Sequence, residues 1–317
     1  MMHILCCTDT NFVIPMGVMM HSLCVNNQCE KLHFHVIIDE SVTEQQKAEL
    51  QTVLPEGAEI SFYLINIENI RQYLVVKVER FPIPIYYRLL MAKILPESVH
   101  KILYLDADMI VRHDLSELWN TPLDNIAVAG VQEVFGSAQC HRLDYPEEKG
   151  YFNSGVLLFN LDFIRSHNIT DQYIKYIIEN PEKLHCPDQD VINYVLRDNK
   201  IPLPLRYNVQ EAYYRDPPLV KDAINGDIEK DICNPVILHY NKEKPWSNKC
   251  EHPLKNIYYY YKNDTIWANS TYMEKFKYKK LNIPLIIQLK IHVYNLLVLL
   301  GLQKKEKVLY REMHLEK

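Results

Sequence analysis

Two acidic side chains that lie two positions apart are the first residues in this sequence with clear chemical potential. Asp106 and Asp108 interrupt the apolar segment KILYLDADMIV, in which residues 102–105 have the pattern of a fully buried strand. Burying a carboxylate without a partner costs several kcal/mol, so two of them in three residues require a cation. In an extended segment, residues i and i+2 project to the same side, so both carboxylates can face one point.

A divalent metal ion is the predicted cation. His239 ends another apolar segment, VILHY, and is the candidate nitrogen ligand beside the two aspartates. Carboxylate oxygens with one imidazole suit Mn²⁺, with Mg²⁺ as the second choice, and they leave about three positions of an octahedron for diphosphate oxygens. Two other interpretations stay open, because a D-x-D pattern also begins turns and a lone histidine is often structural.

The elements that must position these residues follow from the apolar periodicity. Short apolar segments alternate with helical patterns, which predicts an α/β fold with a mainly parallel sheet flanked by helices. In such sheets ligands bind beyond the carboxyl ends of the strands, where Asp9, Asp106 and His239 stand. Strands are expected over residues 3–8, 32–39, 58–65, 101–106, 126–131, 152–162 and 236–240, and helices over 15–27, 41–54, 85–95, 171–179 and 188–198.

Three further segments have a less regular pattern. The helix over 41–54 has Ser41 or Thr43 as its expected N-cap. Residues 202–234 are polar, contain prolines and are weakly periodic, so they are expected to form a long functional loop or short helices. The aromatic segment 256–267 is expected to pack against the main body.

The net charge of −5 conceals an uneven distribution. Residues 274–317 carry a net +6 and residues 1–273 a net −11, so the sequence predicts a main domain over 1–273 and a basic, apolar helical tail over 274–317. An acidic body is unlike a nucleic-acid-binding protein. The tail is typical of a helix on an anionic membrane surface, and docking on the body or on another subunit is the alternative.

The cysteines and the N-terminus indicate the cellular compartment of the protein. The first residues lack the basic stretch and long apolar core of a signal peptide. The eight cysteines are therefore expected to be reduced thiols. These features predict a cytoplasmic protein, with a peripheral position on the inner face of the membrane as an option.

The glycines argue against the common nucleotide-binding loops. Only eight glycines occur, and none form G-x-G-x-x-G or G-x-x-x-x-G-K-[ST]. In CCTDTNF, Asp9 and Asn11 stand where those loops would place glycine. A carboxylate there suits donors such as a uracil N–H or ribose hydroxyls, so a diphosphate would be held elsewhere, by the metal.

Six motifs occur together in this chain: CCTDTNF, IYYRL, YLDADMIV, YFNSGVLLFNLD, PDQDVIN and LHYNKEKPW. In this order and spacing, the chain resembles the retaining glycosyltransferases of family 8, which include bacterial lipopolysaccharide galactosyl- and glucosyltransferases. The resemblance covers about residues 2–250. It implies a GT-A fold, which is a Rossmann-like, mainly parallel sheet, and transfer of a hexose from UDP-galactose or UDP-glucose with Mn²⁺. The implied acceptor is a saccharide that is lipid-linked or part of lipopolysaccharide or another cell-surface glycan.

The resemblance also implies a role for each residue that matches a motif. The metal ligands would be Asp106, Asp108 and His239. The nucleotide would contact Thr8, Asp9, Asn11, Phe12, Asp106, Ala107 and Lys244, with Phe12 against the uracil face. The donor sugar would contact Arg88, Asn153, Ser154, Asp188 and Gln189. The catalytic candidates are Gln189, Asp190 and Lys244, of which Lys244 would stabilise charge on the departing UDP.

Structural interpretations compete with some of these roles. Arg88 could pair with a surface acid, Asn153 could be a turn residue, and Asp188 could be the N-cap of its helix. The mechanism is open as well, because double displacement needs a carboxylate and Gln189 is an amide. A same-face route, in which a UDP oxygen helps to deprotonate the acceptor, is the alternative.

The sequence departs from the family pattern in two places. HYNKEKPW is shorter than the usual element and lacks its glycine, so Lys242 could share the task of Lys244. Gln132 and Glu133 stand where relatives often have an aspartate. Contacts to the acceptor are expected in this region, so the acceptor could differ from that of the relatives. The shortened element leaves open a catalytically impaired UDP-sugar-binding relative. A sugar nucleotidyltransferase is the other alternative, because such enzymes also use metal-bound aspartates on an α/β sheet.

Overall fold

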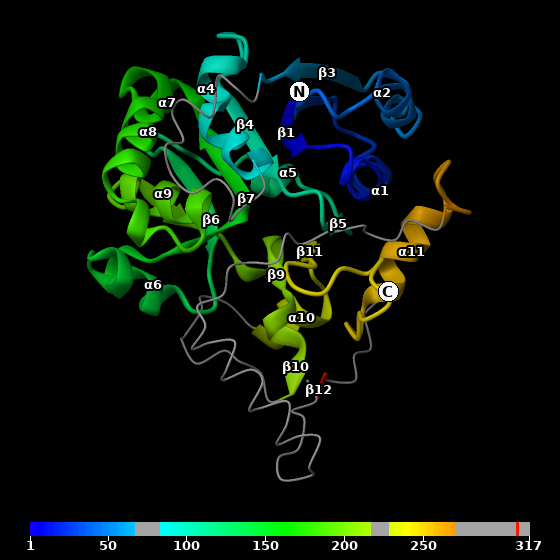
Figure 1. The fold of residues 1–317 in the computed structure, drawn as a ribbon. Coiled ribbons are helices and arrows are strands. Elements are labelled where there is room, and N and C mark those ends of the chain that lie inside the picture. The colour runs from blue at the N-terminus through cyan, green and yellow to red at the C-terminus, as the bar shows by residue number, and fades with distance from the viewer. Residues whose placement is uncertain (67–82, 217–227, 271–308, 311–317) are drawn as a thin grey trace, which may run out of the picture.

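A seven-stranded mixed sheet lies at the centre of the fold (Figure 1). The computed structural model describes residues 1–66, 83–216, 228–270 and 309–310. The strand order is β3-β2-β1-β4-β7-β6-β8. The strands are β1 (Met2–Thr8), β2 (Leu32–Ile38), β3 (Glu59–Leu64), β4 (Lys101–Leu105), β6 (Val128–Gln132), β7 (Phe152–Asn160) and β8 (Lys200–Pro202). Each of the seven strands expected from the sequence forms, although the last one, near His239, belongs to a different sheet.

The sheet is mainly parallel, as predicted, with β7 as the exception. Strands β3, β2, β1 and β4 pair in parallel, whereas β7 runs antiparallel to both β4 and β6. Leu105 at the end of β4 pairs with Val156 in the middle of β7, so the first half of β7 extends past the end of β4. This first half of β7 therefore lies next to Asp106.

Helices cover both faces of this sheet. One face carries α1 (Val13–Asn26) and α2 (Glu44–Gln51), and the other carries η2 (Ile83–Leu90), α4 (Met91–Ile94), α7 (Leu161–Ser166), α8 (Ile169–Glu179) and α9 (Pro187–Val195). Shorter elements are α5 (Ser116–Trp119), α6 (Gly136–Leu143), η3 (Glu147–Lys149) and η4 (Pro181–Lys183). Helix α2 begins with a capping box at Thr43, so Thr43 and not Ser41 is the N-cap.

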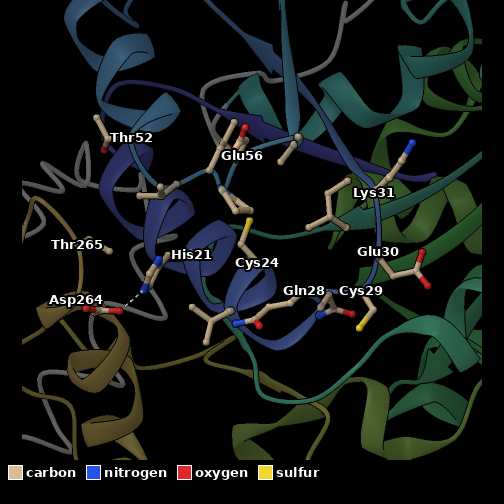
Figure 2. A pocket seen from close by; sticks show the side chains of 18 of the residues that line it. His21, Cys24, Gln28, Cys29, Glu30, Lys31, Thr52, Glu56, Asp264 and Thr265 are labelled. Atoms are coloured by element: carbon tan, nitrogen blue, oxygen red, sulfur yellow. Dashed lines mark hydrogen bonds and ion pairs between the residues drawn. The ribbon is translucent and has the colours of Figure 1, made fainter.

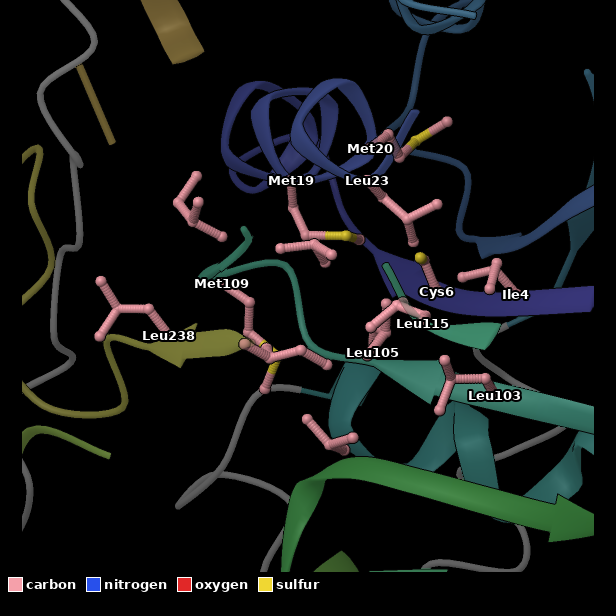
Figure 3. Close-up of a cluster of buried hydrophobic side chains, with 14 of the residues drawn as sticks. Ile4, Cys6, Met19, Met20, Leu23, Leu103, Leu105, Met109, Leu115 and Leu238 are labelled. Carbon is pink, nitrogen blue, oxygen red and sulfur yellow. The ribbon is translucent and has the colours of Figure 1, made fainter. Parts of the chain in front are cut away.

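The buried strands contribute apolar side chains to both faces, which explains their continuous apolar runs. Cys6 of β1 belongs to the cluster under α1, whereas its neighbour Leu5 belongs to the cluster under η2 and α8. Figure 3 shows Met19 and Leu23 of α1 above Cys6 of β1 and Leu105 of β4. The end of β4 is thus anchored in the main core.

A second, three-stranded sheet positions the histidine of the site. It consists of β5 (Met109–Val111), β11 (Ile237–His239) and β9 (Val209–Gln210), in that order. Strand β11 runs antiparallel to β5, and His239 pairs with Met109. The segment expected to form a loop or short helices contains, in its described part, the short helices η5 (Leu205–Tyr207), η6 (Glu211–Tyr214) and α10 (Ile228–Cys233), as expected. It also contains β9 and the short strand β10 (Arg215–Asp216), which were not expected.

The aromatic segment 256–267 packs against the main body, as predicted. It overlaps α11 (Lys255–Asn263), and Asn26 Nδ2 of α1 donates to Tyr261 Oη at 2.9 Å. Gly17 of α1 allows a close approach here, because a Cβ atom at this position would lie 2.2 Å from the ring of Trp267. The glycine is therefore needed for packing rather than for a turn.

The predicted tail lies mostly outside the described residues. Within it, the structure describes only β12 (Leu309–Tyr310), which pairs antiparallel with β10. The predicted domain boundary at residue 273 and the predicted tail helix thus stay predictions. Among the helices in the described ranges, none is both long and apolar enough to span a lipid bilayer.

Candidate functional site

Asp106, Asp108 and His239 converge at the carboxyl end of β4. Their ligand atoms all lie within 4.8 Å of one another. His239 Nε2 is 3.3 Å from Asp108 Oδ1 and 3.9 Å from Asp106 Oδ2. The chain bends at Ala107 and Asp108 instead of staying extended as expected, yet the two carboxylates still face one point. This set of hard oxygens and one imidazole fits Mn²⁺ or Mg²⁺.

The imidazole of His239 is oriented by a buried asparagine that the sequence analysis missed. His239 Nδ1 lies 2.9 Å from Asn208 Oδ1, and Asn208 Nδ2 donates to Asn153 Oδ1 at 2.9 Å. Because the amide oxygen accepts, Nδ1 carries the proton and the lone pair of Nε2 faces the aspartates. Asn208 directly precedes β9, and nothing in its sequence neighbourhood distinguishes it from an ordinary loop asparagine.

Arg88 of η2 balances the acidic groups. Its guanidinium donates to Asp106 Oδ1 at 2.9 Å and to the Ser154 carbonyl at 2.9 Å, and it lies 3.2 Å from Asp188 Oδ2. Arg88 is 6% exposed, so it is not paired with a surface acid. Burial opposes its charge, but Asp106 and Asp188 raise the pKa of Arg88 above its ordinary value. Tyr104 supports the same carboxylate, because its hydroxyl donates to Asp106 Oδ1 at 2.6 Å.

Lys244 contacts Asp108, the second aspartate of the candidate metal site. Its ammonium donates to Asp108 Oδ2 and, at 2.8 Å, to the carbonyl of Tyr240. Burial alone would raise the pKa of Asp108, but Lys244 and His239 lower it well below the usual range of an aspartate. The shortened element HYNKEKPW thus still brings its second lysine to the site, whereas the Lys242 side chain is exposed.

The residues expected to contact the donor sugar form one hydrogen-bonded group where β7 begins. Gln189 Oε1 of α9 accepts from the Ser154 amide at 2.9 Å and from Asn153 Nδ2 at 3.3 Å. Ser154 Oγ donates to Asp188 Oδ2 at 3.0 Å. Burial raises the pKa of Asp188, against the opposing effect of Arg88. Asp188 is not the N-cap of α9, because that position belongs to Cys186.

Glu133 joins this group, although the sequence analysis placed it only near the acceptor. Its Oε2 accepts from Asn153 Nδ2 at 2.8 Å and lies 3.5 Å from Gln189 Nε2. Glu133 follows β6, which pairs with β7, so the sheet places it beside Asn153. A half-buried carboxylate therefore faces the amides of the expected sugar pocket.

The carboxylate of Asp190 is fully engaged in structural contacts. Its Oδ1 accepts from the Arg142 guanidinium and from the Tyr151 hydroxyl, the latter at 2.6 Å. Its Oδ2 accepts from the backbone amides of His185 at 2.7 Å and Cys186 at 2.8 Å. Asp190 is completely buried. The catalytic role predicted for it therefore receives no support from this geometry.

The predicted nucleotide-binding residues lie at the carboxyl end of β1, next to β4. The carboxylate of Asp9 accepts from the backbone amide of Asn11 at 2.9 Å and from its side-chain amide at 3.1 Å. Thr8 is buried, and its hydroxyl donates to the Asp9 carbonyl at 2.9 Å. The ring of Phe12 lies 6.2 Å from that of Trp246, nearly perpendicular to it. Ala107, between the two aspartates of the candidate metal site, is half-buried.

A separate cavity of about 760 Å³ lies at the amino end of β2, and none of the site residues line it. Figure 2 shows His21 and Cys24 of α1 on one side of it and residues 28–31 on another, with His21 paired to Asp264 at 3.0 Å. Nucleotides are expected at the carboxyl ends of parallel strands, and this cavity lies at the opposite end of the sheet.

Sequence comparison identifies relatives over most of the chain. The family described as glycosyl transferase family 8 matches residues 3–250. The chain is 29% identical over 273 residues to General stress protein A of Bacillus subtilis (strain 168), a match that covers 84% of this chain and 94% of that protein. It is 28% identical over 302 residues to lipopolysaccharide glucosyltransferase WaaO of Escherichia coli (strain K12), covering 90% and 85%.

Comparison with solved structures addresses the fold. The galactosyltransferase LgtC in complex with donor and acceptor sugar analogues is similar with a TM-score of 0.73 at 22% identity, covering 84% of this chain and 96% of that chain. The glycosyltransferase GlyE of Streptococcus pneumoniae TIGR4 gives a TM-score of 0.61, also at 22% identity, covering 83% and 61%. The expected fold class is confirmed by these likenesses. The chain therefore belongs to glycosyl transferase family 8, and it is a glycosyltransferase with the GT-A fold.

Proposed function

We propose that this hexosyltransferase moves galactose or glucose from a UDP-sugar to a saccharide acceptor, with retention of configuration and with Mn²⁺ bound by Asp106, Asp108 and His239. The observation that carries the proposal is the convergence of these three ligands beside Lys244, at the carboxyl end of β4. When bound there, Mn²⁺ or Mg²⁺ would polarise the diphosphate as a Lewis acid.

The protein's own side chains supply binding and charge. Asp9 and Asn11 present acceptor and donor groups to uridine, and Phe12 offers an aromatic face to the base. Lys244, which already contacts a metal ligand, is placed to stabilise the negative charge that develops on the departing UDP oxygen. Asn153, Ser154 and Asp188 hold the hydroxyls of the donor sugar, in a group that Arg88 links to Asp106.

The geometry favours a same-face reaction over double displacement. Gln189 is an amide, and its oxygen accepts from the Ser154 backbone, while the carboxylate of Asp190 is occupied by four donors. In the same-face route the bond between C1 of the sugar and the UDP oxygen breaks, and the acceptor oxygen bonds to C1 from the same side. The acceptor proton passes to the departing UDP oxygen, so no protein nucleophile is required.

The nature of the acceptor and the cellular location rest on relatives and on the sequence. Relatives include lipopolysaccharide glucosyltransferase WaaO of Escherichia coli and lipopolysaccharide 1,3-galactosyltransferase of Salmonella typhimurium. We infer a lipid-linked or cell-surface saccharide acceptor, modified in the cytoplasm by the domain over residues 1–273. The basic, apolar tail over 274–317 would then contact an anionic membrane surface.

The direct test is turnover of UDP-galactose and of UDP-glucose with Mn²⁺, followed by NMR. The expected result is that one donor is hydrolysed or transferred, with release of UDP and an initial α-configured sugar. Asp108→Asn should be inactive, whereas Asp124→Asn, which changes an exposed aspartate, should behave like the wild type.

Other outcomes would identify the alternatives. Pyrophosphate in place of UDP would show a nucleotidyltransferase, and a β-configured first product would contradict retention. Metal-dependent UDP binding without turnover of either donor, even with saccharide acceptors, would indicate a catalytically impaired relative. The position of Lys244 beside Asp108 supports an active enzyme over this last possibility.

A further inference from the structure

Three histidines gather on one face of the main sheet, outside the site described above. His3 of β1 pairs with His33 of β2 across the strands, and His35 lies two residues further along β2, so all three side chains share one face. They stand near the amino ends of these parallel strands, whereas Asp106 and Asp108 follow the carboxyl end of β4. The cluster is thus separate from the site of sugar transfer.

The imidazole nitrogens of this cluster face one another. His3 Nδ1 lies 2.9 Å from His35 Nε2, and one ligand nitrogen from each of the three rings lies within 4.8 Å of the others. The rings of His33 and His35 stack with their centroids 4.1 Å apart. Each histidine can thus present a nitrogen to the same point with small side-chain rotations.

We propose that His3, His33 and His35 form a second metal site, which binds Zn²⁺ through imidazole nitrogens. Zinc is a borderline-soft ion that takes four ligands in a tetrahedron, and histidine is one of its preferred ligands. With zinc–nitrogen bonds of about 2.0–2.1 Å, neighbouring ligand atoms stand roughly 3.3 Å apart. The observed 2.9 Å between His3 Nδ1 and His35 Nε2 is close to that spacing.

Side chains of β3 complete the surroundings of this cluster. Glu59 Oε2 lies 3.5 Å from His33 Nδ1, so its carboxylate is placed to serve as the fourth ligand or as a countercharge. His35 Nδ1 lies 2.9 Å from the Tyr63 hydroxyl, which leaves Nε2 of this ring for the metal. Partners of this kind fix the orientation of ligating imidazoles in metal sites. The site therefore has three candidate ligands, and groups of β3 orient two of them, His33 and His35.

Protonation and access also suit metal binding. Burial, with help from His33 and His3, lowers the pKa of His35 to about 3, and burial and His33 lower the pKa of His3. Neutral imidazole is the form that binds a metal ion, and the hydrogen shared between His3 Nδ1 and His35 Nε2 would move to the other nitrogen of its ring as the ion binds. The side chain of His33 is 17% exposed, so an ion can reach the cluster from solvent while His35 stays buried.

Cobalt is a suitable probe, because four-coordinate Co²⁺ with nitrogen ligands absorbs visible light much more strongly than six-coordinate Co²⁺ with oxygen ligands. The experiment titrates CoCl₂ into the full-length Asp108→Asn protein, in which the oxygen-rich site is impaired. We expect one equivalent of Co²⁺ with strong visible bands, and we expect Zn²⁺ to abolish these bands by displacement. This readout does not depend on sugar transfer, so it succeeds or fails independently of the proposed function.

Substitutions in the same background decide whether the bands come from this cluster. His33→Gln and His3→Gln should each remove the strong bands and weaken binding by roughly tenfold or more. His141→Gln is the matched control, because that side chain is 74% exposed and pairs with Glu147 elsewhere. Circular dichroism verifies that each variant is folded. Weak bands in the parent protein, or bands unchanged in both His33→Gln and His3→Gln, would show that the histidines form only a hydrogen-bonded ladder and would overturn the proposal.

Discussion

His239 Nδ1 lies 2.9 Å from Asn208 Oδ1, and this contact joins the proposed metal ligands to the proposed sugar pocket. The same amide donates to Asn153, which in turn contacts Glu133 and Gln189. A single buried asparagine thus fixes the tautomer of a proposed metal ligand and the position of a residue proposed to bind the donor sugar. A shift of the His239 imidazole is therefore expected to move Asn153 as well, and a shift of Asn153 to move the imidazole.

Substitution of Asn208 tests that connection. Asn208→Ala removes the acceptor for His239 Nδ1, and loss of such a partner typically lowers metal affinity by about 10–100-fold. Mn²⁺ titration followed by electron paramagnetic resonance measures the affinity, and activity should partly recover at high Mn²⁺. The control is Asn263→Ala, which changes the exposed last residue of α11. Equal Mn²⁺ affinity in Asn208→Ala and wild type would refute the orienting role.

Gly155 provides a second test of how His239 is held. A Cβ atom at this position would lie 2.5 Å from His239 Cε1 and 2.6 Å from Met109 Cε. Gly155→Ala should therefore push the imidazole away from the aspartates, at a stability cost of about 1–3 kcal/mol. We expect weaker Mn²⁺ binding in a protein that still folds, as measured by Mn²⁺ titration and circular dichroism. Unchanged Mn²⁺ affinity would mean that the imidazole has more freedom than these contacts imply.

Arg88 should matter for stability as well as for binding. Arg88→Met leaves Asp188 buried without its cation, and removing one partner of a buried ion pair costs about 3–5 kcal/mol. The surface pair between Lys93 and Asp171 offers a matched control, because both side chains are more than half exposed. Lys93→Met should change the free energy of unfolding by about 1 kcal/mol or less. Denaturant unfolding measures the free energy of unfolding of both variants. Similar losses in Arg88→Met and Lys93→Met would contradict the role of Arg88 as the cation of a buried ion pair.

Lys200 gives the fold a specific pH dependence. Its ammonium donates to Gly150 O at 2.7 Å and to Asn193 Oδ1 at 2.8 Å, and burial lowers its pKa to about 7. The unfolded chain keeps this proton up to about pH 10. Above pH 7 the unfolded state therefore binds more protons, and the free energy of unfolding rises with pH by up to about 1.4 kcal/mol per unit.

Comparison with a variant isolates this contribution. Between about pH 7 and pH 9, the free energy of unfolding of the wild type should increase relative to that of Lys200→Met, in which no proton is exchanged at this position. Groups other than Lys200 titrate in both proteins and cancel in the difference. If the free energies of unfolding of the two proteins changed with pH in parallel over this range, the burial of Lys200 would not perturb its protonation.

The sequence predicts the parts of the site that depend on local patterns. Asp106 and Asp108 stand out because apolar residues flank them, and His239 because it ends an apolar strand. The family motifs add Arg88, Lys244 and Gln189, all of which the structure brings to the same region. Their proximity could be predicted because the end of a strand in a parallel sheet is set by the chain itself, whereas their roles stay predictions.

Other parts depend on contacts between distant segments. Asn208 acquires its role only because β9 lies beside β11, a pairing that no local pattern indicates. Asp190 follows Gln189 in sequence, but consecutive helix residues point about 100° apart, so its carboxylate faces Arg142 and Tyr151 instead of the sugar pocket. The antiparallel direction of β7 could not be predicted from the sequence either, because a strand buried on both faces has the same apolar pattern in either direction.

The central claim is that Asp106, Asp108 and His239 bind a metal ion through which the protein holds UDP. The most direct measurement is calorimetric titration of UDP into the wild type and into Asp108→Asn, each with Mn²⁺ and with EDTA. We predict that the wild type binds UDP tightly only with Mn²⁺, and that Asp108→Asn binds it weakly under both conditions. UDP binding of equal strength in all four titrations would contradict the account.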